Sequence, residues 1–106
     1  MSTSLDYYMS FKQYVMAIEA ELEKDTHLNM FFSPFNLAYL VEVRWVGPVG
    51  PDLIAVHYFE EYGDKICHNR WIGHYAHIQF NLRVDKGSRP LGRWFTSNPV
   101  VKLYGN

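Results

Sequence analysis

Apolar and polar side chains alternate strictly over residues 74–85 (HYAHIQFNLRVD). This alternation is typical of a β-strand with one buried face and one open face. The apolar positions are Ala76, Ile78, Phe80, Leu82 and Val84, and the polar positions are Tyr75, His77, Gln79, Asn81, Arg83 and Asp85. The polar side chains supply varied hydrogen-bond donors and acceptors. Two interpretations stay open for that face: a solvated strand surface or a binding surface.

A second pattern, with steps of three and four residues, precedes this strand near the N-terminus. Its apolar members fall on one side of an α-helix and are Tyr8, Phe11, Val15, Ile18 and Leu22. Thr3 or Ser4 can cap this helix, and Asp6 lies in its first turn, where a negative charge is favourable. We expect the helix to end near residues 25–27 and to pack its apolar stripe against the core.

The rest of the chain predicts further strands separated by Gly and Pro. The expected strands cover residues 36–46, 53–62 and 66–72, with a short edge strand at residues 100–104. The expected connections are residues 28–35, a wide loop at residues 47–51, a turn at residues 63–65 and a bulge or bend at Gly73. This succession predicts one domain, residues 1–106, of the α+β class. One N-terminal amphipathic helix packs on a four- to five-stranded, mostly antiparallel sheet in two layers.

The composition adds an excess of aromatic side chains. A chain of 106 residues buries a modest core, yet it carries 7 Phe, 8 Tyr and 3 Trp. We therefore expect some rings at a binding surface, and a homo-oligomer as one way of covering them. The single Cys67 excludes an intramolecular disulfide, and the N-terminus shows no basic start followed by an apolar run. These features predict a cytoplasmic location without a membrane span.

The net charge of −1 hides an asymmetry along the chain. Residues 1–64 hold three basic and ten acidic side chains, a net of −7, whereas residues 65–106 hold seven basic side chains against Asp85, a net of +6. Two interpretations stay open: an anion-binding half, or two halves that neutralise each other in the fold. The sequence pI of about 6.5 and the lack of a known motif argue against a nucleic-acid binder.

The loop at residues 86–93 (KGSRPLGR) is the strongest candidate for an anion site. Glycines let backbone N–H groups approach an anion, and Ser88, Arg89 and Arg93 add donors and charge, with Arg83 on the preceding strand. The spacing matches neither a P-loop nor a dinucleotide fingerprint. This loop predicts binding of an anionic nucleotide; the alternative is a solvated turn.

Metal and catalytic sites find little support in the sequence. Cys67, His68, His74 and His77 resemble a ligand cluster, but positions 74 and 77 would leave opposite faces of a strand. Cys67 could meet His57 or His77 across strands, yet no complete set of nucleophile, base and orienting group can be assembled. We therefore expect no metal, no cofactor and no catalytic residue, and rank a small hydrolase third among the functions.

The combined features favour a protein that binds a macromolecular partner stoichiometrically, as inhibitors, immunity proteins and phage-type accessory factors do. This association is one of composition: a small, aromatic-rich domain with opposite charges and no catalytic set. The expected partner-binding side chains are Trp71, Tyr75, His77 and Trp94. A protein partner ranks first, and a small-ligand protein that sequesters an anionic nucleotide is the alternative.

Overall fold

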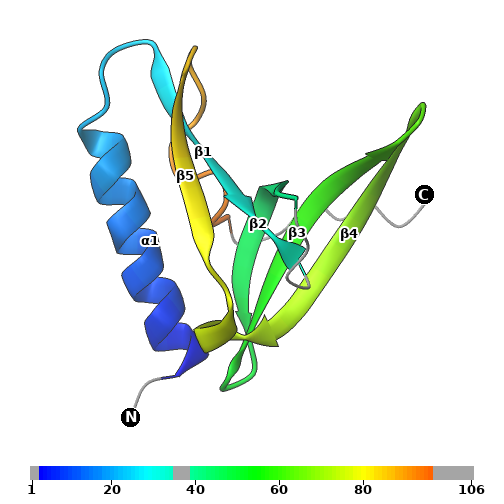
Figure 1. Ribbon diagram of the computed structural model, residues 1–106. Helices are drawn as coiled ribbons and strands as arrows, with labels where there is room; N and C mark the ends of the chain where they lie inside the picture. The colour runs from blue at the N-terminus through cyan, green and yellow to red at the C-terminus, as the bar shows by residue number, and fades with distance from the viewer. Residues whose placement is uncertain (1–2, 35–38, 97–106) are drawn as a thin grey trace.

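A computed structural model describes residues 3–34 and 39–96 (Figure 1). One N-terminal helix packs on a five-stranded antiparallel sheet, which confirms the predicted α+β class. The elements are α1 (Ser4–Ala20), β1 (Thr26–Phe32), β2 (Val41–Val49), β3 (Leu53–Tyr62), β4 (Lys65–His74), a 3-10 helix (Tyr75–His77) and β5 (Phe80–Lys86). The strand order is β4-β3-β2-β1-β5.

Helix α1 begins with a capping box at Thr3. The Thr3 hydroxyl accepts from the Asp6 amide at 3.2 Å, and the Asp6 carboxylate accepts from the Thr3 amide at 3.2 Å. Of the two expected caps, Thr3 is therefore the one used, while Ser4 is buried and its hydroxyl donates to the Gly50 carbonyl. The expected helix end near residues 25–27 is wrong, because α1 stops at Ala20 and the chain enters β1 at Thr26.

Strand β1 replaces the connector expected at residues 28–35. It pairs with β5 along its whole length and with β2 at its end. Its alternate side chains Leu28, Met30 and Phe32 are buried, whereas Asn29 and Phe31 face the other way. The strand could not be predicted from the sequence for two reasons. Phe31 interrupts the apolar/polar alternation, and the strand is stabilised by pairing with strands on both sides, which are distant in sequence.

Strand β2 begins and ends later than expected. It runs through Gly47 and Pro48, so the wide loop expected at residues 47–51 shrinks to a turn at residues 50–52. The Val46 amide points away from β3 and donates to the Trp94 carbonyl at 3.0 Å. The Pro48 nitrogen, two residues on, points the same way, where no ladder partner is required, and this is why a proline fits here. Of the first residues of the expected strand, 36–38 lie outside the described part.

Strands β3 and β4 form the hairpin that the sequence predicts. β3 has the expected bounds, and Gly63, with φ of 64°, opens the two-residue turn into β4. The bend expected at Gly73 is wrong, since Gly73 pairs with Ile54 inside β4. A Cβ at Gly73 would lie 2.4 Å from the Trp71 ring. The glycine therefore makes room for an indole that lies across it.

The alternating segment 74–85 is not one strand. A 3-10 helix interrupts it, and only residues 80–86 form β5. β4 and β5 are opposite edges of the sheet, which would lie about 19 Å apart if four strand spacings were laid flat. Residues 75–79, partly helical, can bridge about 16 Å at most. The sheet therefore curls, and the ring of Phe32 on β1 lies 6.1 Å from that of Trp71 on β4.

The curl opens a gap between β1 and β2 that the segment around Trp94 fills. These strands pair only at Phe31↔Glu42 and Phe32↔Val41 and then diverge. Trp94 is fully buried there, its indole N–H donating to the Val43 carbonyl at 3.1 Å. The segment around Trp94 thus satisfies β2 backbone groups that a longer β1–β2 ladder would have paired. The edge strand expected at residues 100–104 lies outside the described part.

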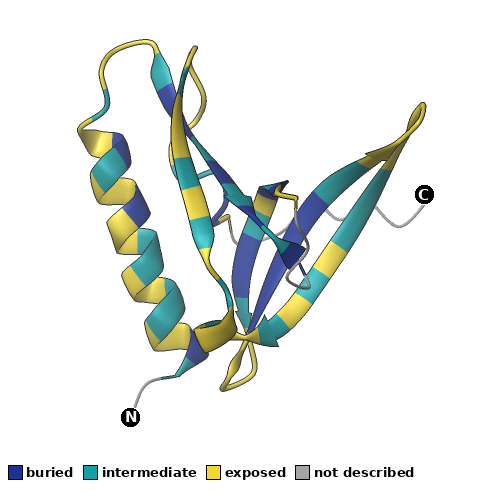
Figure 2. Ribbon diagram, viewed as in Figure 1, coloured by how far each residue is buried: buried dark blue, intermediate teal, exposed yellow. Residues whose placement is uncertain are grey.

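The two faces of the sheet differ sharply. The inner face packs on α1, with Val15 in the core and the Phe11 ring stacked on Phe80 at 4.6 Å. Buried residues concentrate on β1, β2 and β3, whereas β4 and β5 carry none (Figure 2). The opposite side, here called the outer face, carries the alternate side chains Glu42, Arg44, Trp45, Ala55, His57, Phe59, Glu61, Ile66, His68, Arg70, Ile72, His27, Asn29, Phe31, Asn81, Arg83 and Asp85.

Candidate functional site

A row of aromatic rings crosses the outer face on the β3–β4 hairpin. The hairpin register sets Phe59 opposite His68 and His57 opposite Arg70. The ring centroids lie 4.4 Å apart for Phe59 and His68, 5.6 Å for His68 and His57, and 4.9 Å for His57 and Trp45 on β2. Position in two adjacent strands thus brings together side chains that are about ten residues apart in sequence.

An irregularity in β2 adds Arg44 to this row. The β2–β3 register shifts between Val43 and Trp45, so that Arg44 and Trp45 both face outward. The Arg44 guanidinium lies over the Phe59 ring at 4.5 Å and forms an ion pair with Glu42 at 3.9 Å. Stacking on the ring restricts the guanidinium while leaving most of its N–H donors available.

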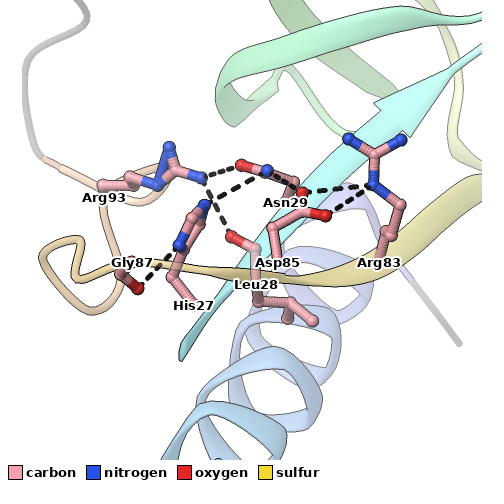
Figure 3. Close-up of polar contacts among 7 residues, drawn as sticks. All are labelled: His27, Leu28, Asn29, Arg83, Asp85, Gly87 and Arg93. Carbon is pink, nitrogen blue, oxygen red and sulfur yellow. Dashed lines mark hydrogen bonds and ion pairs between the residues drawn. The ribbon is translucent and has the colours of Figure 1, made fainter. Parts of the chain in front are cut away.

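Arg93 approaches from the segment that follows β5 (Figure 3). Its Nη2 donates to the Leu28 carbonyl at 2.9 Å and to Asn29 Oδ1 at 2.6 Å. Its guanidinium also lies over the Trp94 ring at 4.4 Å. Three contacts therefore fix the position of this cation in the gap between β1 and β2.

A hydrogen-bond chain holds the far side of Arg93 in place (Figure 3). His27 Nδ1 donates to the Gly87 carbonyl at 2.9 Å, so its Nε2 accepts from the Asn29 amide at 3.3 Å. The same Asn29 amide donates to Asp85, whose carboxylate also accepts from Arg83 Nε at 3.0 Å. The hydrogen bond from Asn29, with those from Arg83, lowers the pKa of Asp85 and keeps it charged.

Between these groups lies a hollow, here called the outer-face pocket. It encloses about 320 Å³ and is lined by Val43, Arg44, Phe59, His68 and Arg93. Burial first, and then the charge of Arg44, lowers the pKa of His68. Burial also lowers the pKa of Arg93, and Arg89 and Arg44 lower it further, while Glu42 and Glu19 raise it. The pocket therefore holds two guanidiniums that repel each other across a partly apolar floor.

A larger hollow of about 470 Å³ adjoins this pocket and shares Arg44 and Phe59 with it. Its remaining lining is apolar or acidic and consists of Tyr39, Leu40, Val41, Glu42, Glu60, Glu61 and Ile66. The Arg44–Phe59 pair thus stands at the border between a basic hollow and an acidic one.

The residues of the predicted anion site do not converge on one position. Ser88 and Arg89 are exposed, Arg83 is paired with Asp85, and Arg93 is held against β1. The Gly87 amide, one of the donors expected to face an anion, donates to the Asp25 carbonyl at 2.7 Å. Of the four predicted residues, the structure places Arg93 alone in the lining of the outer-face pocket.

The predicted partner-binding residues are also dispersed. Trp71 faces inward against Phe32, and the Tyr75 ring stacks on Tyr7 of α1 at 5.4 Å. His77 is exposed at the end of the 3-10 helix. Trp94, expected on or near an open face, is 0% exposed and belongs to the core. The sequence could not show this, because the gap that Trp94 fills arises from the curl of the sheet.

Four residues of the pocket region were not identified as one site from the sequence: Arg44, His57, Phe59 and His68. A signal for three of them existed, because a two-residue turn at Gly63 and Asp64 fixes which β3 and β4 positions face each other. Arg44 had no such signal, since its outward position depends on the β2 irregularity. The same register sets Cys67 opposite Glu60 on the inner face, away from His57, so that the Cys–His pair considered above does not form.

Within residues 3–34 and 39–96, no three His, Cys, Asp or Glu side chains are grouped so that they could hold a metal ion. No helix in this part of the chain is long and apolar enough to cross a membrane. Comparison of the chain with protein-family models, curated proteins and solved structures finds no match.

Proposed function

We propose that this chain is a non-enzymatic binding protein that occupies an acidic surface of a protein partner, at one-to-one stoichiometry, through its outer face. The observation that carries this proposal is the pair of arginines stacked on outward-facing rings, Arg44 on Phe59 at 4.5 Å and Arg83 on Phe31 at 4.7 Å. Arginine beside an aromatic ring combines a large contact area with directed charge, and such residues often dominate binding energy.

The charge distribution supports an acidic partner. In the described part of the chain the two ion pairs are Arg44–Glu42 and Arg83–Asp85, and each joins residues from the same half of the sequence. Ion pairs therefore do not neutralise the basic half against the acidic half there. The positive charge of the basic half that these ion pairs leave uncompensated would steer an acidic surface towards the outer face and fix its orientation.

The test is capture of a partner from the native host, followed by kinetics with the purified pair. Arg44→Glu and Arg83→Glu should each weaken binding at least tenfold. Raising the salt concentration should lower the association rate constant and leave the dissociation rate constant largely unchanged. Lys24→Glu is the matched control, because it makes the same charge change in the α1–β1 connection. Equal losses for Lys24→Glu, or association that does not respond to salt, would contradict the proposal.

The sequestering of a small anionic ligand, such as a nucleotide, is the second candidate. The observation that favours it is the basic outer-face pocket rather than the loop at residues 86–93, of which Arg93 is held by β1 and Ser88 and Arg89 are exposed.

A further inference from the structure

We infer that the outer-face pocket is a binding site for a single oxyanion group, a carboxylate or a phosphate, carried on a small apolar body. The pocket is lined by Val43, Arg44, Phe59, His68 and Arg93. Its volume of about 320 Å³ lies at the lower end of the range for ligand sites. It therefore suits a ligand of about the size of a substituted benzene ring or an acidic side chain.

Unpartnered polar nitrogens gather at this pocket. Among the described residues, three buried side-chain nitrogens have no hydrogen-bond partner: Arg93 Nε, His68 Nε2 and His57 Nδ1. Arg93 and His68 line the pocket, and the His57 ring lies 5.6 Å from that of His68. A buried polar group without a partner costs about 1–3 kcal/mol. An oxyanion in the pocket would accept a hydrogen bond from Arg93 Nε, and one from His68 in the tautomer that carries its proton on Nε2, and would offset part of that cost.

The charges favour an anion at the same point. Arg44 and Arg93 both line the pocket, and the nearby countercharges are Glu42, 3.9 Å from Arg44, and Glu19, which acts on Arg93. An oxyanion between the guanidiniums would replace their repulsion with two charge-assisted contacts. Both cations are already held in place, Arg44 on Phe59 and Arg93 on Trp94 and β1, so that little ordering is needed on binding.

The surroundings limit the ligand to one anionic end. Phe59 gives the pocket an apolar wall, and the adjoining hollow adds Leu40 and Ile66. That hollow also carries Glu42, Glu60 and Glu61, which would repel a second anionic group. An aromatic or aliphatic monoacid should therefore bind more tightly than either a small inorganic anion or a diacid.

The experiment titrates the full chain, without any partner, with phenylacetate, phenyl phosphate, acetate, inorganic phosphate and the neutral phenylacetamide. Binding is followed by calorimetry and by the NMR signals of the histidine rings. Phenylacetate and phenyl phosphate should bind at least fivefold more tightly than acetate and inorganic phosphate, and phenylacetamide should not bind. The pKa of His68 should rise in the complex, because the bound anion opposes the effect of Arg44.

Four variants locate the site. Arg44→Gln should weaken phenylacetate binding at least tenfold, and Glu42→Gln should strengthen it two- to fivefold, because it removes the competing negative charge. Arg70→Gln is the matched control, since Arg70 is exposed on the outer face but does not line the pocket. Circular dichroism checks the fold of each variant, and Arg44→Lys, which keeps the charge without the planar stack, should bind with intermediate affinity.

Phenylacetamide binding as tightly as phenylacetate, or equal affinities in Arg44→Gln and Arg70→Gln, would overturn the inference. The source of the oxyanion is decided by competition. If phenylacetate displaces a captured partner, the natural oxyanion is a carboxylate or phosphate of that partner, and this reading rests on the proposed function. If phenylacetate binds but no outer-face partner exists, the ligand is a free acid, so that the pocket stands while the proposed function fails.

Discussion

His57 is the most unusual single side chain of the protein. It is 3% exposed, lies between the rings of Trp45 and His68, and has a buried Nδ1 without a partner in the described part of the chain. Burial, and then the charges of His68 and Arg70, lowers its pKa from 6.5 to about 4. His57 is therefore neutral near pH 7, which lets a histidine lie among basic residues.

This shift predicts a loss of stability on mild acidification. Between pH 6.5 and about 4 the unfolded chain protonates His57 while the folded chain does not, so the free energy of unfolding falls as the pH is lowered. The total effect is on the order of 3 kcal/mol, at about 1.4 kcal/mol per pH unit. Urea unfolding at several pH values measures it. His57→Gln should flatten the dependence in this window, and parallel curves for both proteins would contradict the prediction.

Trp94 shows how burial changes the meaning of an aromatic residue. Its ring fills the gap between β1 and β2, and its indole N–H and carbonyl both bond to β2. Loss of a buried aromatic ring of this kind costs about 3–5 kcal/mol.

We therefore predict that Trp94→Ala unfolds much of the protein at room temperature, with a strongly lowered melting temperature. Arg44→Ala, whose side chain is 42% exposed, should change the free energy of unfolding by less than about 1 kcal/mol. Thermal unfolding followed by circular dichroism compares the two variants. A Trp94→Ala protein as stable as the wild type would show that Trp94 is not part of the core.

Strand β5 retains the face separation that its sequence predicts. Phe80 and Leu82 pack against the core on the inner face, and Asn81 and Arg83 are exposed on the outer face. Phe80 also stacks on Phe11, which ties this edge strand to α1.

Phe80→Ala should consequently lower the free energy of unfolding by about 3 kcal/mol, as expected for loss of a packed aromatic side chain. Asn81→Ala, one residue further along the same strand, should cost less than about 0.5 kcal/mol, because its side chain faces solvent. Chemical denaturation of both variants gives the two values. Similar losses at the two positions would mean that the β5 register is wrong.

Apolar side chains are also exposed on α1 and in the segment beside it, apart from the outer face. Leu5, Met9 and Met16 are exposed on α1. Leu91 is exposed in the segment that follows β5, where Gly92 lies beside Met16. Strands β4 and β5 also leave their outer edges unpaired in the described sheet. Exposed apolar residues and open strand edges both promote association between identical chains.

Self-association to a symmetric dimer is therefore the expected state at high micromolar concentration. Light scattering coupled to size exclusion measures the mass directly. Met9→Glu combined with Met16→Glu should return the protein to a monomer if α1 forms the contact, whereas Tyr14→Glu, an exposed change elsewhere on α1, serves as the control. A monomeric wild type at these concentrations would remove the prediction.

Sequence alone was enough to specify those helices and strands whose periodicity, caps and turns all lie within a short segment. The spacing from Tyr8 to Ile18 and the Thr3 cap specify α1, and the strand formers and the turn at Gly63 and Asp64 specify the β3–β4 hairpin. These signals depend on periodicity and on turn geometry, which neighbouring residues set among themselves. For the same reason the α+β class was predictable.

Tertiary structure alone decided the features that depend on distant partners. β1 is a strand because β2 and β5 pair with it, and residues 75–77 leave the alternating segment because the sheet curls to bring its edges together. The outer-face pocket combines Arg44 and Arg93, about fifty residues apart, across the gap that the curl opens. No local pattern encodes that contact, since it follows from where two strands diverge and which segment fills the space between them.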